Sequence, residues 1–163
     1  MNIDLTNEQD YMQDYPFGFG CNSVKWFPGI TGKNIKIIDI ESSWNFFHED
    51  LIQNNGGLIY GTMSNNQYAE DHGTACLGLI GADINGIGIN GIIPDAICFA
   101  SSHASGPASK AIVAAGDKLS KGDVILLEMQ MAPDTTSGMK YKLIPIEYYD
   151  DFFYAIKYCT DKG

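Results

Sequence analysis

Short apolar runs recur along the chain, each bounded by turn-forming residues. They lie at 35–40, 58–60, 97–100 and 124–127. The first run, Ile35-Lys36-Ile37-Ile38-Asp39-Ile40, is rich in β-branched residues and nearly continuous in its apolar character, as in a parallel strand buried on both faces. We expect these four runs to form strands.

Between the strands, apolar residues recur at helical spacing. This pattern predicts helices over about 73–82, 107–119 and 147–162, with Pro107 at a first-turn position. Strands that alternate with helices indicate an α/β fold, a mostly parallel open sheet with helices on both faces. In such sheets ligands bind beyond the carboxyl ends of the strands, so we look for chemistry after Ile38, Ala100 and Leu127.

Length and local composition divide the chain into two parts. A length of 163 residues is typical of one domain. Residues 1–33 are rich in aromatics and turn formers, and we expect an irregular arm packed by its aromatic rings, with one short helical turn near 24–27. Residues 34–163 carry the strands and helices.

The charge balance narrows the range of partners. Ten lysines and no arginine stand against 20 acidic residues, a net charge of −10. Nucleic-acid binding depends on basic residues, so we expect no nucleic-acid partner. No apolar run is long enough to cross a membrane. The start of the chain lacks a signal-peptide pattern, which favours the cytoplasm if Met1 is the true first residue; the compartment is otherwise unassigned.

Four cysteines, Cys21, Cys76, Cys98 and Cys159, fit no zinc-binding spacing. Free buried thiols in a reducing compartment are the favoured interpretation. Two disulfide bridges in an exported protein are the alternative.

Asp39 and His72 are the residues whose chemistry stands out. Asp39 is a carboxylate near the end of an apolar strand, and a buried carboxylate needs a partner. His72 precedes the predicted helix start, where the helix dipole favours the neutral imidazole of a general base. Each alone is more often structural, but an aspartate some 30 residues before a histidine matches one chain order of serine-hydrolase triads; here the separation is 33.

Several linked motifs around these residues resemble those of subtilisin-like serine peptidases. The run 35–39 followed by His48-Glu49-Asp50-Leu51 resembles their aspartate region, and 72–78, His-Gly-Thr-Ala-Cys-Leu-Gly, resembles "H-G-T-H-V-A-G". Residues 85–96 resemble "N-x-x-G-V-x-G-V-A-P-x-A", and 123–127 the strand that leads to the substrate-binding backbone. The resemblance covers roughly residues 24–163 and implies the N-terminal half of a subtilisin-like catalytic domain.

The resemblance also implies roles for particular residues. Asp39 is the expected triad aspartate and His72 the expected base, while the backbone of Glu128, Met129 and Gln130 is expected to pair with a peptide or protein substrate. Asp50 and Asn85 match positions that contribute to a calcium site in many members, although polar turns explain them equally well. No cofactor is required by this chemistry.

The chain departs from the family pattern at several places. Ile40 and Glu41 replace small residues after the aspartate, and Ala75 replaces the second histidine of the histidine motif. Glu41 shares a strand face with Asp39, and two neighbouring carboxylates weaken the field that stabilises imidazolium. Glu128-Met129-Gln130 stands where the family has "S-L-G", so side chains replace an open pocket.

The nucleophile is the largest departure. The family's serine lies about 150 residues beyond the histidine, and residue 163 is 91 beyond His72. Thr136-Ser137-Gly138-Met139 imitates the serine motif, but we interpret it as a decoy in a loop. We therefore expect a serine-bearing remainder of the domain as a partner, and an exposed sheet edge that favours self-association in the chain alone.

Three functions remain open on the sequence. The favoured one is part of a serine endopeptidase that hydrolyses peptide bonds only when a serine-bearing segment completes it; we expect the chain alone to be inactive. The alternative is a non-catalytic peptide- or partner-binding remnant. A remote third is a nucleotide-binding α/β module, because Gly86-Ile87-Gly88-Ile89-Asn90-Gly91 fits G-x-G-x-x-G, although no helix pattern follows it.

Overall fold

A parallel sheet of four strands forms the centre of the computed structural model, which describes residues 3–133 and 143–163. The strands are β1 (Lys36–Asp39), β2 (Asn55–Tyr60), β3 (Ile97–Ser101) and β4 (Val124–Leu126). Their order is β2-β3-β1-β4, and every neighbouring pair is parallel. All four predicted strands are therefore confirmed, although β2 begins earlier than its apolar residues indicate.

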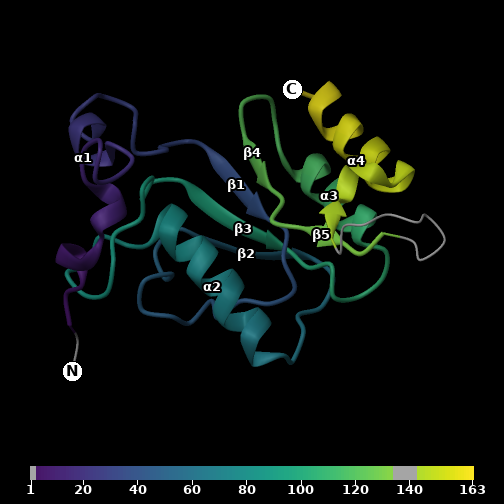
Figure 1. The fold of residues 1–163 in the computed structure, drawn as a ribbon, viewed down its shortest axis with the longest axis horizontal. Helices are drawn as coiled ribbons and strands as arrows, with labels where there is room; N and C mark the ends of the chain where they lie inside the picture. The colour runs from purple at the N-terminus through teal and green to yellow at the C-terminus, as the bar shows by residue number, and fades with distance from the viewer. Residues whose placement is uncertain (1–2, 134–142) are drawn as a thin grey trace.

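Helices cover both faces of this sheet (Figure 1). They are α2 (Gln67–Gly81), α3 (Ala108–Lys118) and α4 (Asp150–Asp161), with the short α1 (Cys21–Val24) near the start of the chain. Within the described residues, 3-10 turns lie at Thr6–Glu8, Asp10–Met12 and Ile146–Tyr148, and a two-stranded antiparallel ribbon joins β5 (Gln130–Met131) to β6 (Ile144–Pro145). The predicted α/β class is confirmed.

The two sheet faces have separate apolar cores. Ile38 and Ile40 point to one side, where they pack with Ile112 of α3 and Phe152 of α4. Cys98 and Ala100 of β3 point to the other side and pack with Leu77 of α2, Trp44 and Leu51. Because side chains alternate along a strand, Asp39 lies on the face that α2 covers.

Helix α2 begins earlier than the apolar spacing predicts. Its N-cap is Asn66, whose side-chain oxygen accepts a hydrogen bond from the backbone N–H of Ala69 at 3.1 Å. The first turns are polar because they lie at the surface, so the hydrophobic period does not reveal them. His72 therefore stands in the second turn of α2, and the expectation that it lies at the positive end of the helix is wrong.

The N-terminal arm is not packed by its aromatic rings. Hydrogen bonds hold it to the loop before β3: Gln9 Nε2 donates to the carbonyl of Asn90 at 2.8 Å, and the N–H of Asn90 donates to Gln9 Oε1 at 2.9 Å. The backbone N–H of Leu5 also donates to the carbonyl of Gly88, at 2.7 Å. The aromatic side chains predicted to pack are largely exposed: Tyr15, Phe17, Phe19, Trp26 and Phe27.

The glycine run at 86–91 lies in a loop between α2 and β3. A dinucleotide-binding fingerprint instead follows a strand and opens a helix. The order of elements is thus the reverse of what nucleotide binding requires, and the remote nucleotide-binding hypothesis loses its basis. Among the described residues, no helix combines the length and apolarity needed to cross a bilayer.

Close packing fixes α2 against the loop after β1, and two helical glycines test this contact. A Cβ on Gly73 would lie 2.3 Å from the carbonyl oxygen of Ser43, whereas a Cβ on Gly78 would meet only the Ile89 side chain, at 3.6 Å. We expect Gly73→Ala to lower the free energy of unfolding by roughly 1–3 kcal/mol through overpacking. Gly78→Ala is the matched control and should raise it by about 0.5–1 kcal/mol through helix propensity.

Urea unfolding of both variants measures this difference. Equal effects of the two substitutions would contradict the close approach of α2 to Ser43.

Candidate functional site

The register of the sheet brings two glutamates together. In the parallel pairing of β1 with β4, Asp39 lies opposite Leu126. Glu41 and Glu128 each follow two residues later, so both lie beyond the carboxyl ends of adjacent strands. Because side chains repeat every two residues, the register predicts that they reach the same side of the sheet as Asp39.

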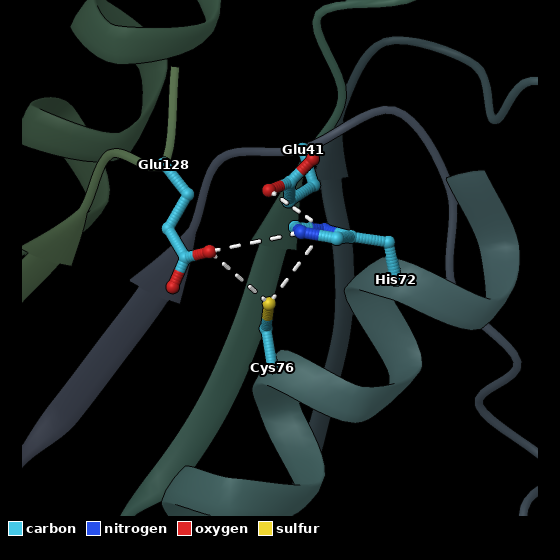
Figure 2. A group of neighbouring side chains, drawn as sticks. All are labelled: Glu41, His72, Cys76 and Glu128. Atoms are coloured by element: carbon cyan, nitrogen blue, oxygen red, sulfur yellow. Dashed lines mark hydrogen bonds and ion pairs between the residues drawn. The ribbon is translucent and has the colours of Figure 1, made fainter. Parts of the chain in front are cut away.

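Helix α2 supplies two more side chains to this place. His72 and Cys76 are four residues apart and therefore share one face of the helix. Figure 2 shows these two side chains pointing toward Glu41 and Glu128. Cys76 Sγ lies 3.7 Å from His72 Nδ1 and donates to Glu128 Oε2 at 3.5 Å, while His72 Nε2 lies 3.8 Å from Glu128 Oε2.

Glu41 makes the shortest contact with the imidazole. Its Oε1 lies 3.2 Å from His72 Nδ1, within ion-pair distance. The same oxygen is buried and makes no hydrogen bond of good geometry. A buried carboxylate oxygen without a donor is costly, so this position favours a positively charged or strongly donating neighbour.

Asp39 has a different partner from the one predicted. Its Oδ2 accepts a hydrogen bond from Trp44 Nε1 at 2.8 Å, and its Oδ1 is buried without a partner. Although both residues lie in the described part of the chain, neither a hydrogen bond nor an ion pair joins Asp39 to His72. Instead, Trp44 donates to the aspartate and Glu41 faces Nδ1 of the imidazole, while the roles of Asp39 and His72 as a triad pair stay a prediction.

Burial shifts the pKa values of the acidic groups in this cluster. Burial is the main cause that raises the pKa of Asp39 to about 7, with the charges of Glu41 and Glu128 acting in the same direction. Burial also raises the pKa of Glu41, against the opposing charge of His72. Burial, followed by the charges of Asp39 and Glu128, raises the pKa of the Cys76 thiol to about 12. The cluster therefore disfavours negative charge.

The three residues expected to bind substrate have unlike surroundings. Gln130 begins β5 and lies opposite Pro145 of β6 in the antiparallel ribbon. Glu128 and Met129 belong to no strand. A role for their backbone in binding peptides stays a prediction. The decoy motif at 136–139 lies outside the described residues.

The predicted calcium residues lie in neighbouring loops. Asp50 is buried, and its Oδ2 accepts from the backbone N–H of Ile89 at 3.2 Å. Asn85 Nδ2 donates to the carbonyl of Glu49 at 2.9 Å. Both side chains thus tie the 48–52 turn to the 83–89 loop. Calcium binding stays a prediction.

Cys76 and Trp44 are the members of the site that sequence reasoning missed. The spacing of Cys76 from His72 carried a signal, since residues i and i+4 share a helix face. Trp44 carried none, because four residues separate it from Asp39 and only the three-dimensional path of that loop brings the indole to the carboxylate.

The fold defines an α/β domain with an aspartate at the end of β1 and a histidine on α2. Comparison with known proteins relates the sequence to subtilisin-type peptidases. Minor extracellular protease Epr of Bacillus subtilis (strain 168) is 45% identical over 75 residues, or 46% of this chain and 12% of that protein. Subtilisin E of the same strain and subtilisin J of Geobacillus stearothermophilus are each 33% identical over 95 residues.

These similarities confirm a subtilisin-like relationship. The alignments with subtilisins E and J each cover 56% of this chain and 25% of the subtilisin. The chain thus matches a quarter or less of the length of these relatives. No family model matches the sequence.

The raised pKa of Asp39 makes a prediction about stability. Its carboxyl has an ordinary pKa of 3.8 and a folded pKa of about 7. The unfolded chain therefore ionises first, and stability falls as the pH rises from 3.8 to 7 and then levels off. Asp39→Asn removes this penalty, so between about pH 5 and about pH 8 the unsubstituted chain should lose roughly 2–3 kcal/mol more than the variant.

Urea unfolding at the two pH values measures this difference, and Asp123→Asn is the matched control. Burial opposes the shift at Asp123, but backbone N–H groups of Lys36 and Ser120 and the Lys36 charge lower its pKa. Its carboxylate is ionised in both states over this range, so the control should keep the unsubstituted pH dependence. Parallel curves for Asp39→Asn and the unsubstituted chain would contradict the raised pKa.

Proposed function

We propose that the chain is the aspartate- and histidine-bearing part of a subtilisin-like serine endopeptidase, with His72 as general base. The observation that carries the proposal is the 3.2 Å contact of Glu41 Oε1 with His72 Nδ1. A carboxylate at Nδ1 selects the tautomer with the proton on that nitrogen and leaves Nε2 free to accept a proton from a serine hydroxyl.

In this proposal Glu41 and Asp39 share the role that the triad aspartate alone has in the family. Glu41 is the positioning residue, since it contacts the imidazole directly. Asp39 does not contact the imidazole; burial reduces its charge, and the hydrogen bond from Trp44 fixes its position. When ionised, Asp39 adds to the negative field that stabilises the imidazolium formed as the serine loses its proton.

Glu128 has to move for a serine to approach. Its Oε2 lies 3.8 Å from His72 Nε2, on the side that a nucleophile needs. The Glu128 side chain is 43% exposed, so rotation toward solvent is open to it. A serine-bearing segment that displaces this carboxylate therefore completes the reaction centre.

The free edge of β4 is the docking place that we propose for such a segment. β4 pairs with β1 on one side, and within residues 3–133 and 143–163 no strand pairs with its other side. Beside this edge, α3 and α4 leave an apolar pocket whose lining includes Ile112, Leu119, Ile125, Leu127 and Ile156. An added parallel strand would satisfy the backbone of β4 and cover the pocket.

Without that segment, the same edge should bind a second copy of the chain. We expect concentration-dependent association, and Val124→Lys on the edge strand should shift the chain toward the monomer because a charged edge opposes strand pairing. Ile97→Lys is the matched control: Val124 is 46% exposed and Ile97 is 40% exposed, but Ile97 begins the interior strand β3. Sedimentation analysis measures the mass. A monomeric unsubstituted chain at high concentration, or equal effects of the two variants, would contradict the proposal.

A non-catalytic, partner-binding role is the second candidate. The observation that favours it is the position of Glu128 beside His72 Nε2, together with the failure of Asp39 to contact His72. A domain that has lost catalysis would keep the docking edge and tolerate these departures.

A chimera separates the two candidates. We propose joining Gly163 to the serine-bearing C-terminal part of subtilisin E, beginning at the residue that continues the chain after the equivalent of α4. A fluorophosphonate probe should label the chimera and leave the 163-residue chain unlabelled, because only the chimera carries the nucleophilic serine of the triad. His72→Ala in the chimera should lower hydrolysis of a peptide substrate by several orders of magnitude. Glu41→Gln should lower kcat and shift its pH profile.

Circular dichroism and thermal melting show whether the chimera folds. A folded chimera that neither reacts with the probe nor cleaves peptides would support the non-catalytic role. Labelling of the chain alone would refute the assignment of the nucleophile to another segment.

A further inference from the structure

The side chains around His72 form a set that peptidase chemistry does not explain. One ligand atom from each of Glu41, His72, Cys76 and Glu128 can be chosen so that all four lie within 4.8 Å of one another. A general base needs one carboxylate beside it, and here two carboxylates and a thiol surround a single imidazole (Figure 2). We propose that this cluster binds a zinc ion. The proposal needs only these four residues and does not rest on peptidase activity.

The spacing of the atoms fits a tetrahedral ion. At zinc–ligand bond lengths of about 2.0–2.3 Å, ligand atoms of a tetrahedral site lie roughly 3.3–3.7 Å apart. Glu41 Oε1 and Cys76 Sγ lie 3.2 and 3.7 Å from His72 Nδ1, and Glu128 Oε2 lies 3.5 Å from Cys76 Sγ. The Glu128 side chain is 43% exposed, so it is free to turn and offer an oxygen as the fourth ligand.

The chemistry of the donors selects the class of ion. Thiolate and imidazole ligands favour zinc-like ions, whereas calcium and magnesium take oxygen ligands almost exclusively. Cys76 and His72 project from successive turns of a regular helix, which holds the two donors at a fixed spacing. Glu41 comes from the loop after β1, and Glu128 from the segment after β4, so three parts of the fold converge on one point.

An independent observation points to a missing positive charge. Glu41 is 8% exposed, and its buried Oε1 makes no hydrogen bond of good geometry, although His72 Nδ1 lies 3.2 Å away. Bound zinc would satisfy this oxygen. It would also convert the Cys76 thiol to a thiolate, which a coordinated ion stabilises although burial alone disfavours it.

Zinc binding and base catalysis compete for the same imidazole. His72 Nδ1 lies closest to Glu41 and Cys76, and its lone pair would be used by the ion. When zinc binds at Nδ1, that nitrogen carries no proton. In the peptidase proposal the same nitrogen carries the proton that faces Glu41. A zinc-loaded chain is therefore a different state of the site from the one that accepts a proton from serine.

The test uses the 163-residue chain after removal of metals with a chelator. Titration with zinc chloride, followed by calorimetry at neutral pH, should show one zinc per chain. Cobalt chloride in place of zinc should give the absorption of a tetrahedral cobalt ion together with a thiolate-to-cobalt band. Excess calcium chloride should not displace the cobalt, which separates this site from the calcium predicted at Asp50 and Asn85.

Single substitutions locate the ion. Cys76→Ser should weaken zinc binding at least about tenfold and remove the thiolate band, and Glu128→Gln should weaken binding about tenfold with the band retained. Cys159→Ser is the matched control, because Cys159 packs between α3 and α4 on the opposite face of the sheet and should leave both readouts unchanged. Since Glu128 is half-exposed, Glu128→Gln tests the site even if the change at Cys76 disturbs folding.

Two results would overturn the proposal. One is the failure of the folded chain to bind zinc or cobalt, and the other is equal affinity in the unsubstituted chain, Cys76→Ser and Glu128→Gln. Because neither measurement involves a serine or a substrate, an inactive chimera would leave this proposal standing, and loss of zinc binding would leave the peptidase proposal standing.

Discussion

The parallel register between β1 and β4 is the constraint on which the rest of the site depends. It places Asp39 opposite Leu126, and the hydrogen bond from the Ile40 N–H to the Leu126 carbonyl at 3.1 Å continues the pairing by one residue. Glu41 and Glu128 follow at equal distances from this point. A shift of either strand by one residue would turn one of these side chains to the opposite face, so the cluster exists only in this register.

That register places acidic side chains close together, and the surrounding residues compensate their negative charge only in part. Three acidic residues, Asp39, Glu41 and Glu128, lie near one another at the end of the sheet, and the raised pKa values of Asp39 and Glu41 express the cost. Trp44 donates to one oxygen of Asp39, and His72 faces Glu41 and Glu128. One buried oxygen of each of Asp39 and Glu41 still makes no hydrogen bond of good geometry. The site is therefore built to receive a proton or a cation.

Local patterns in the sequence were enough to predict the sheet and most of the helices. β-branched runs such as 35–40 are buried on both faces of the sheet, so nearly every position in them requires an apolar residue. The start of α2 could not be found in the same way, because residues 67–71 lie at the surface and carry no apolar period. The N-terminal arm shows the opposite failure. Its aromatic residues, such as Tyr15 and Phe17, indicate packing, but their rings are exposed in the fold.

The candidate site was predictable residue by residue but not as a set of contacts. Asp39, Glu41, His72 and Glu128 were each identified from motifs. Which carboxylate meets the imidazole depends on the loop that returns Trp44 to Asp39, and no local rule describes that loop. Spacing within α2 did contain the pairing of His72 with Cys76, and a search for metal ligands at i and i+4 would have found it.

The tight contact of α2 with the loop after β1 links these observations into one argument. Gly73 lets the helix approach the carbonyl of Ser43 and the indole of Trp44 closely. The same approach sets the height of His72 and Cys76 above the sheet, and it holds Trp44 where it donates to Asp39. With Asp39 engaged by the indole, Glu41 is left to face His72 Nδ1. A serine-bearing segment or a metal ion that binds at His72 therefore meets an imidazole that is already positioned, with Glu41 as its carboxylate partner. This partner is the point at which the site departs from the family pattern, and it determines what the site can bind.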